Sequence, residues 1–196
     1  MKKIVAALLV STAVLGAGCT QVQYGDAQAV ETTTADFGST DLQLTAEKMV
    51  DSMLSFPPVV QVVAQKRPVM YVDKIKNKTT EHIDTESVTD TITTKLLQSG
   101  KFRLTDMTKV EELQRQLDYQ NKSGMVDDAT SAKIGRQIGA EYMLYGNLSS
   151  IVKRDGSTKD VYYKFTMKLM HIESGQIEWQ DEKEIRKVQK KSFLGM

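Results

Sequence analysis

The sequence predicts a single α/β domain in which helices pack on a mixed β-sheet. Helical and strand patterns alternate through most of the chain, and strand-like segments joined by short turns follow near its end. Strands separated by helices favour parallel pairing, whereas strands joined by tight turns pair antiparallel. We therefore expect one sandwich domain with a mixed sheet, a C-terminal antiparallel meander and about four flanking helices.

The predicted domain begins at Asp41 with an amphipathic helix. Thr40 or Asp41 is suited to cap this helix, because each side chain offers an oxygen to the free amides of the first turn. The prolines in residues 56–58 should end it, since proline lacks an amide donor. Residues 59–65 then predict one more turn of helix, and residues 67–73 a short buried strand.

The middle of the chain predicts a loop, a strand and three helices. Residues 76–82 are polar and are expected to form a loop. Asp84 or Thr85 should cap the next helix, which ends at Ser99-Gly100. The buried stripe of this helix is expected to be Val88, Ile92, Leu96 and Leu97. A second strand is predicted at 102–104, and two further helices at 108–119 and from Asp127 or Asp128 to Gly139.

The last third of the sequence predicts the three-stranded meander. Its strands cover 142–148, 161–172 and a segment that starts at Ile177, with turns at 154–157 and 173–176. The middle strand alternates strictly, and its inner face is predicted to carry Tyr163, Phe165, Met167, Leu169 and His171. Trp179 is expected in the core, and the basic residues after Arg186 are predicted to be a frayed tail.

Residues 1–18 have the features of a secretory signal peptide. Two lysines precede a short apolar run, and Gly16-Ala17-Gly18 leads directly to Cys19. The run is short for a membrane-spanning helix. A cysteine in this place is typical of a bacterial lipobox, so we expect Cys19 to be the lipidated first residue of the exported protein. An ordinary signal peptide followed by a chance cysteine is the alternative.

Residues 19–40 are predicted to be a lipidated, disordered tether. They are polar, rich in Thr, Gln and Ala, and without periodicity. About twenty residues reach roughly 70 Å when stretched and span roughly 25 Å when relaxed. All three prolines lie after this segment, so it lacks the residue that stiffens linkers. The folded domain then takes 41–196.

The composition favours a binding protein over an enzyme. The chain has 26 basic and 25 acidic residues, a balance that gives no support to nucleic-acid binding. One cysteine and two histidines are too few for a zinc site. No nucleophile elbow, metalloprotease or phosphate-loop motif occurs. The adjacent Asp127 and Asp128 are better explained as helix caps than as an acid–base pair. We expect no catalytic residue, no metal ligand and no cofactor.

Several short strings occur in the order in which they stand in one known family. They are Val72-Asp73 with residues 77–79, then residues 97–102, 132–146 and 174–179. On these strings, residues 67–186 resemble the penicillin-binding protein activator LpoB family of outer-membrane lipoproteins. The curli-export lipoprotein and the N-terminal domain of TolB use a similar α/β shape.

The resemblance implies a lipoprotein of the outer membrane that faces the periplasm. It would dock on a non-catalytic domain of a class A penicillin-binding protein and stimulate glycan polymerisation, and cross-linking with it. It would need no cofactor, and we expect a monomer. The short tether departs from the long proline-rich tether of known members. The alternative is a component of outer-membrane assembly or transport, like the curli-export lipoprotein; a wall hydrolase is disfavoured because no nucleophile–base pair is evident.

The candidate partner-binding residues fall in two places. Loops after strands often carry function, and the polar loop is mixed in charge. A second basic pair lies three residues apart on a predicted helix, hence on one face, where it would suit an acidic partner. A plain solvated surface is the alternative for both. The candidates are Asn77, Lys78, Thr79, Glu81 and His82 in the first group, and Lys133 and Arg136 in the second.

Overall fold

The computed structural model describes residues 25–30, 34–106, 109, 112 and 139–191. The helices are α1 (Ser39–Ser55), α2 (Pro57–Gln65) and α3 (Thr85–Gln98); the strands are β1 (Val69–Val72), β2 (Lys76–Lys78), β3 (Arg103–Leu104), β4 (Tyr142–Asp155), β5 (Thr158–His171) and β6 (Ile177–Lys190). The strands form one six-stranded sheet in the order β3-β1-β4-β5-β6, with β2 also paired to β4. Pairing is parallel among β1, β2, β3 and β4 and antiparallel through β4, β5 and β6. The predicted mixed sheet and C-terminal meander are confirmed.

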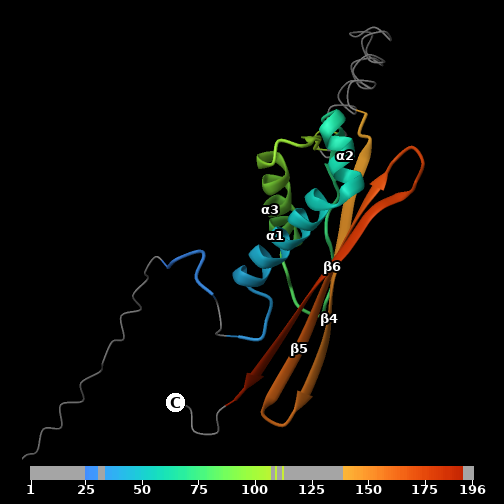
Figure 1. Ribbon diagram of the computed structural model, residues 1–196. Coiled ribbons are helices and arrows are strands. Elements are labelled where there is room, and N and C mark those ends of the chain that lie inside the picture. The colour runs from blue at the N-terminus through green and yellow to red at the C-terminus, as the bar shows by residue number, and fades with distance from the viewer. Residues whose placement is uncertain (1–24, 31–33, 107–108, 110–111, 113–138, 192–196) are drawn as a thin grey trace, which may run out of the picture.

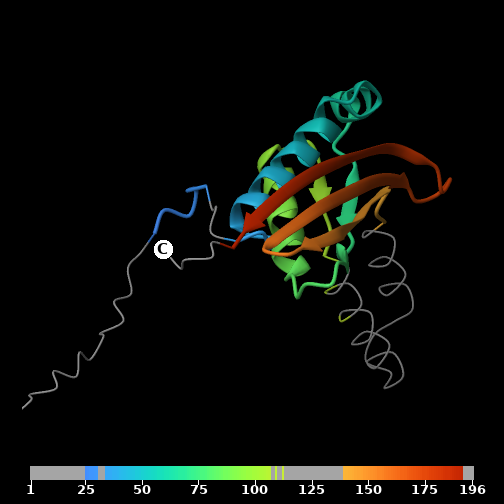
Figure 2. The ribbon, with the colours of Figure 1, turned by 90° about the horizontal axis from the view of Figure 1, so that it is seen from below.

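The three helices lie on one side of the sheet (Figures 1 and 2). The core between the two layers includes Met49 and Met53 of α1, Ile92 of α3 and Phe165 of β5, each no more than 1% exposed. α1 packs along β6, where the Asp181 carboxylate accepts hydrogen bonds from side chains of α1. The predicted helices at 108–119 and 127–139 lie outside the described residues. Within the described part of the chain, no helix is long and apolar enough to cross a membrane.

α1 begins at Ser39, two residues before the predicted start, and Gly38 is its N-cap residue. The prediction of a cap at Thr40 or Asp41 is therefore wrong. Asp41 lies in the first turn, where its carboxylate accepts the Gly38 N–H at 2.9 Å and faces the positive end of the helix dipole. The predicted break at 56–58 is confirmed. α2 is a full nine-residue helix with Pro57 at its first position, where the missing amide costs nothing.

α3 follows its local sequence signals closely. The Asp84 side chain accepts two amides of the first turn, as predicted, and the helix ends before Gly100, which has φ +67°. The predicted stripe is buried through Leu96, but Leu97 is 52% exposed. Adjacent helical residues point about 100° apart, so the helix that buries Leu96 turns Leu97 towards solvent.

The meander strands each have 14 residues and are longer than predicted. Residues 187–190 of β6 pair with 158–161 of β5, so the predicted frayed tail after Arg186 is wrong for these four residues, while 192–196 lie outside the described residues. Its charged residues are those of an exposed edge strand. The turn between β4 and β5 has two central residues, 156 and 157, and of these only Gly156 has a positive φ. This is the pattern of a type II′ turn, whose backbone twist matches that of the flanking strands. The predicted inner face of β5 is confirmed through Leu169; His171 is half-buried at the strand end, and Trp179 is in the core.

β1 and β2 run along the same side of β4 as one interrupted strand. β1 ends at a pair with Leu144, and β2 begins at a pair with Asn147. Residues 73–75 therefore stand opposite only two residues of β4, which makes one residue an insertion, as in a β-bulge. Ile75 turns into the core here, and its displaced amide donates to Thr89 Oγ1 of α3 at 3.3 Å.

The predicted loop at 76–82 is thus wrong for its first three residues, which form β2. All three are exposed, so no apolar pattern marks the strand. Gly146 of β4 lies beside the bulge. A Cβ at this glycine would strike the Thr166 carbonyl oxygen and would lie 3.3 Å from Ile75 Cδ1. The bulge therefore packs against a site on β4 that has room only for glycine.

Candidate interaction surface

The loop formed by residues 79–82, which we call the 79–82 loop, is held in shape by hydrogen bonds with the end of β2. Asn77 Nδ2 donates to the Glu81 carbonyl at 2.8 Å, and the Thr79 amide donates to Asn77 Oδ1 at 2.9 Å. The Glu81 amide donates to Thr79 Oγ1 at 3.1 Å. Asn and Thr side chains commonly close turns in this way. The loop is therefore a defined turn, and Asn77 and Thr79 shape it.

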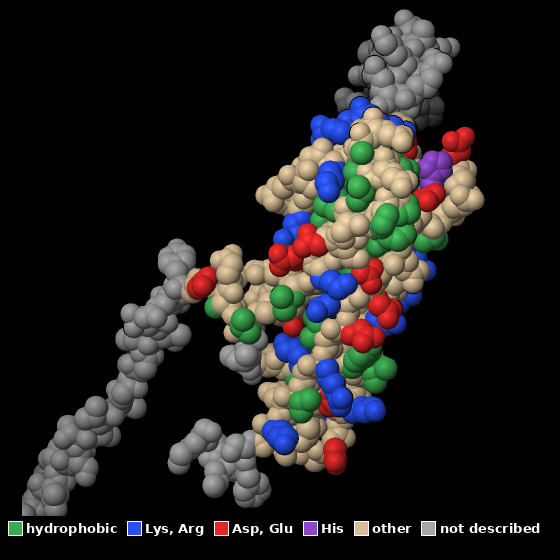
Figure 3. All heavy atoms as spheres, viewed as in Figure 1, with side chains coloured by type: hydrophobic (Ala, Val, Ile, Leu, Met, Phe, Trp, Pro, Cys, Tyr) green, Lys and Arg blue, Asp and Glu red, His purple; other side chains and the backbone are tan. Residues whose placement is uncertain are grey.

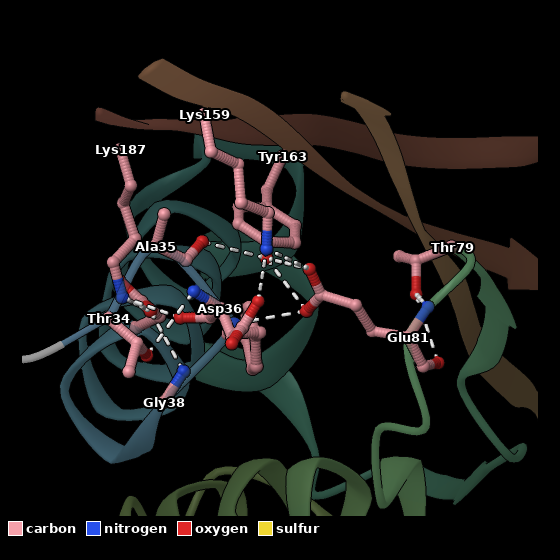
Figure 4. Close-up of polar contacts among 11 residues, drawn as sticks. Thr34, Ala35, Asp36, Gly38, Thr79, Glu81, Lys159, Tyr163 and Lys187 are labelled. Carbon is pink, nitrogen blue, oxygen red and sulfur yellow. Dashed lines mark hydrogen bonds and ion pairs between the residues drawn. The ribbon is translucent and has the colours of Figure 1, made fainter. Parts of the chain in front are cut away.

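Glu81 points away from solvent, into a polar cluster beneath the meander (Figure 4). Its carboxylate oxygens lie 2.6 and 2.7 Å from the Tyr163 hydroxyl, and one accepts the Phe37 N–H at 3.1 Å. Lys159 Nζ is 3.9 Å away. The side chain is only 18% exposed. Glu81 is thus a structural anchor of the loop, whatever the loop binds.

Two ion pairs complete the cluster. The Asp36 carboxylate pairs with Lys159, and this hydrogen bond lowers the pKa of Asp36. Lys187 Nζ donates to the Asp36 carbonyl at 2.6 Å and to Asp41 Oδ2 at 2.9 Å. Asp41 is almost fully buried, and a buried carboxylate needs a partner of opposite charge. The Lys187 amine is that partner.

Burial raises the pKa of the Tyr163 hydroxyl, and its hydrogen bond to Glu81 raises it further. The tyrosine therefore stays neutral and donates its single proton. No sequence pattern predicts that Lys159 and Lys187 pair with the aspartates of this cluster. Strand alternation does place Tyr163 in the core, where a phenol needs a polar partner.

The opposite face of the sheet carries a different set of charges. Lys76 and Lys78 are exposed there and share a face with Asn147 and Ser149 of β4. Within the described ranges, no ion pair involves either lysine. These two lysines, which we call the β2 lysines, are available to a negatively charged partner.

The neighbouring strands on this face neutralise their own charges. Lys164 pairs with Glu182 at 2.6 Å, and Arg186 binds Asp160 through two nitrogens at 2.6 and 3.1 Å. The Arg186 bond lowers the pKa of Asp160. Such cross-strand pairs hold β5 and β6 together.

The structure therefore divides the first group of sequence candidates. Asn77, Lys78 and His82 are exposed, Thr79 is half-buried, and Glu81 faces inward. Lys78 is on the open sheet face, whereas the loop bends towards the helix side. Cys19, Lys133 and Arg136 lie outside the described residues, and all these partner-binding and lipidation assignments stay predictions. On the helix side, Figure 3 shows acidic, basic and hydrophobic side chains interspersed.

These features define an α/β sandwich domain with a six-stranded sheet, a loop closed by side-chain hydrogen bonds and two exposed lysines on the open face. Among the described residues, no three His, Cys, Asp or Glu side chains gather as metal ligands would. The chain belongs to the family described as peptidoglycan-synthase activator LpoB, whose model matches residues 41–185. Members of this family are regulators of a synthase and not enzymes themselves.

The chain is similar to curated proteins named penicillin-binding protein activator LpoB. It is 26% identical to the one from Salmonella typhimurium over 111 residues, which cover 57% of this chain and 49% of that protein. The protein from Escherichia coli K12 is also 26% identical over 111 residues, with 57% and 48% covered. The match thus spans about half the length of these relatives.

Solved structures of LpoB C-terminal domains are also similar. The domain from Salmonella enterica has a TM-score of 0.47 and 22% identity, covering 74% of this chain and 98% of that one. The domain from Escherichia coli has a TM-score of 0.46 and 24% identity, with the same coverage. The expected likeness to the N-terminal domain of TolB stays a prediction.

Proposed function

We propose that this protein is an outer-membrane lipoprotein that binds a class A penicillin-binding protein and stimulates its glycan polymerisation, and cross-linking with it. The observation that carries the proposal is the family match, which runs from α1 almost to the end of β6. The names of the curated relatives supply the class of partner. The partner's contact would be a non-catalytic domain, because an activator must leave the active sites free.

A regulator of this kind acts by differential binding. The domain must bind the active conformation of the synthase more tightly than the resting one, since only that difference shifts the population. A tenfold preference corresponds to about 1.4 kcal/mol. A rigid surface suits this task, because little ordering is needed when it docks.

We place the docking surface on the β2 lysines of the open sheet face and on the exposed part of the 79–82 loop, so that the partner would reach around the end of β2. Lys76, Lys78 and His82 are all exposed and come from one short stretch of chain. Unpaired lysines on an open sheet face favour a partner with an acidic patch, and attraction of this kind raises the association rate. Binding should therefore weaken as salt is added.

The anchor of the proposed lipoprotein is Cys19, and the domain would face the periplasm. Ala35 is buried against the domain, and the Ala27 carbonyl already accepts a hydrogen bond from Gln43 of α1 at 2.9 Å, so about seven residues remain between that contact and Cys19. They reach roughly 25 Å when fully stretched. The synthase would have to extend towards the outer membrane to meet a domain held on so short a tether.

The test is glycan polymerisation by class A penicillin-binding proteins with and without the full chain in detergent. We expect a severalfold faster rate with one synthase. The double substitution Lys76→Glu and Lys78→Glu should remove most of this stimulation and weaken binding, because it reverses the charges of both β2 lysines.

The matched control is Lys190→Glu with Lys191→Glu, which reverses two exposed charges at the far end of β6. It should leave stimulation unchanged. Absence of binding and stimulation with every synthase tested would reject the activator role. Stimulation lost equally in both double variants would reject the β2 lysines as the docking surface and leave the activator role standing.

A further inference from the structure

The chain just before α1 is seated on the domain. Ala35 is 2% exposed, and the Phe37 ring meets Tyr163 edge to face with 5.6 Å between ring centroids. We call residues 35–38 the strap. The strap covers the inner face of the meander around Tyr163, beyond the first turn of α1 (Figures 1 and 4). The segment that enters the domain is therefore packed and not a free linker.

The strap is bonded to two separate strands and to the loop. Its carbonyl at Ala35 lies 3.1 Å from the Tyr163 hydroxyl of β5, and its carbonyl at Asp36 accepts from Lys187 of β6. Its amide at Phe37 donates to the Glu81 carboxylate. Each bond connects segments that are more than 40 residues apart in sequence.

Glu81 is the residue that joins the strap to the 79–82 loop. Its side chain accepts the strap amide, while its own backbone closes the loop through Thr79 and Asn77. Moving the carboxylate therefore disturbs the loop, and reshaping the loop withdraws the carboxylate from the strap. A half-buried carboxylate that lost these hydrogen bonds would be left partly unsatisfied, which favours joint opening over separate opening.

We propose that the strap and the 79–82 loop open and close as one unit, so that displacement of the chain at Thr34 controls the order of the loop. The coupling itself is a property of the fold. The role of this coupling in docking rests on the proposed function: tension on the tether would loosen the 79–82 loop, which forms part of the docking surface. By linkage, a partner that bound the closed loop would also favour the closed strap, because the coupling free energy is the same in both directions.

Hydrogen exchange of single amides in the full chain tests this coupling without any synthase. The reporters are the Phe37 amide in the strap, the Glu81 amide in the loop and the Ile92 amide in α3. The substitution Phe37→Ala removes the ring that seats the strap. We expect exchange at Glu81 to become about tenfold faster, with Ile92 unchanged. Val30→Ala, at a position 74% exposed and upstream of the strap, is the control and should change nothing.

The reciprocal variant is Thr79→Val, which removes the hydroxyl that accepts the Glu81 amide. It should speed exchange at Phe37 by a similar factor, whereas Thr80→Val at the exposed neighbouring position should not. This variant alters the loop alone, so it still decides the question if Phe37→Ala does not fold.

Three results would overturn the proposal. One is faster exchange of the strap amides after Phe37→Ala with an unchanged exchange rate at the Glu81 amide of the loop. Another is an unchanged Phe37 amide after Thr79→Val. The third is an equal rise at Ile92, which would mean that the whole domain opens and that no separate unit exists. None of these outcomes depends on whether the protein activates a synthase.

Discussion

Replacing Tyr163 with phenylalanine removes one oxygen atom and keeps the ring that packs in the core. The hydroxyl lies 2.6 Å from the Glu81 carboxylate, and Tyr163 as a whole is only 1% exposed. Hydrogen bonds to a charged group contribute about 1.5–3 kcal/mol, and this one also keeps a half-buried carboxylate satisfied. We expect Tyr163→Phe to lower the free energy of unfolding by about 2 kcal/mol, which lowers Tm by about 4 to 8 °C for a domain of this size.

The control for this substitution is the next residue along the strand. Tyr162 points to the opposite, open face, where its hydroxyl bonds to Glu184. Tyr162→Phe deletes the same atom but should shift Tm by no more than about 1 °C, since surface changes are usually small. Thermal unfolding followed by circular dichroism gives both values. Equal shifts in the two variants, or no shift in Tyr163→Phe, would refute the assignment of Glu81 as an anchor.

Three further predictions follow from local geometry. Gly146→Ala should cost about 2 kcal/mol by overpacking, whereas Gly25→Ala, with open space around it, should leave the urea midpoint unchanged; equal midpoints would contradict the tight packing at the bulge. The hydrogen bond to Glu184 raises the pKa of Tyr162 to about 12, so the hydroxyl stays protonated below that pH. In Glu184→Gln, the pH at which the phenolate absorbance of Tyr162 appears should fall towards 10. Asp84→Ala should lower stability by about 1 kcal/mol through loss of the N-cap, and Asp84→Asn, which can still accept the amides, should recover most of it.

The parts of the fold that were predictable are those specified by neighbours in sequence. α3 has a capping aspartate at one end and a glycine with positive φ at the other, and β5 alternates strictly between core and surface. Each pattern has its physical cause within a few residues. The mixed sheet then follows from the order of helices and strands.

The parts that were missed depend on distant partners. β2 reads as three polar residues, and only pairing with β4 makes it a strand. The end of β6 looks like a basic tail until Lys187 meets Asp41, 146 residues away. The buried bond between Tyr163 and Glu81 spans 82 residues. Single-sequence patterns contain no distance information of this kind, so the cluster around Glu81 appeared only in three dimensions.

The bulge between β1 and β2 separates the number of residues in the chain from the face on which the following side chains lie. Side chains alternate along a strand with period two, so an extra residue in a regular strand would exchange the two faces. Here residues 73–75 stand opposite only two residues of β4, and the bulge absorbs the extra one: Ile75 is inside, and the β2 lysines lie beside Asn147 and Ser149 on the open face. Deleting one residue from 73–75 would restore regular alternation and should leave both lysines on the open face. Among natural variants, loss of one residue at the bulge should therefore be compatible with an unchanged outer face of β2.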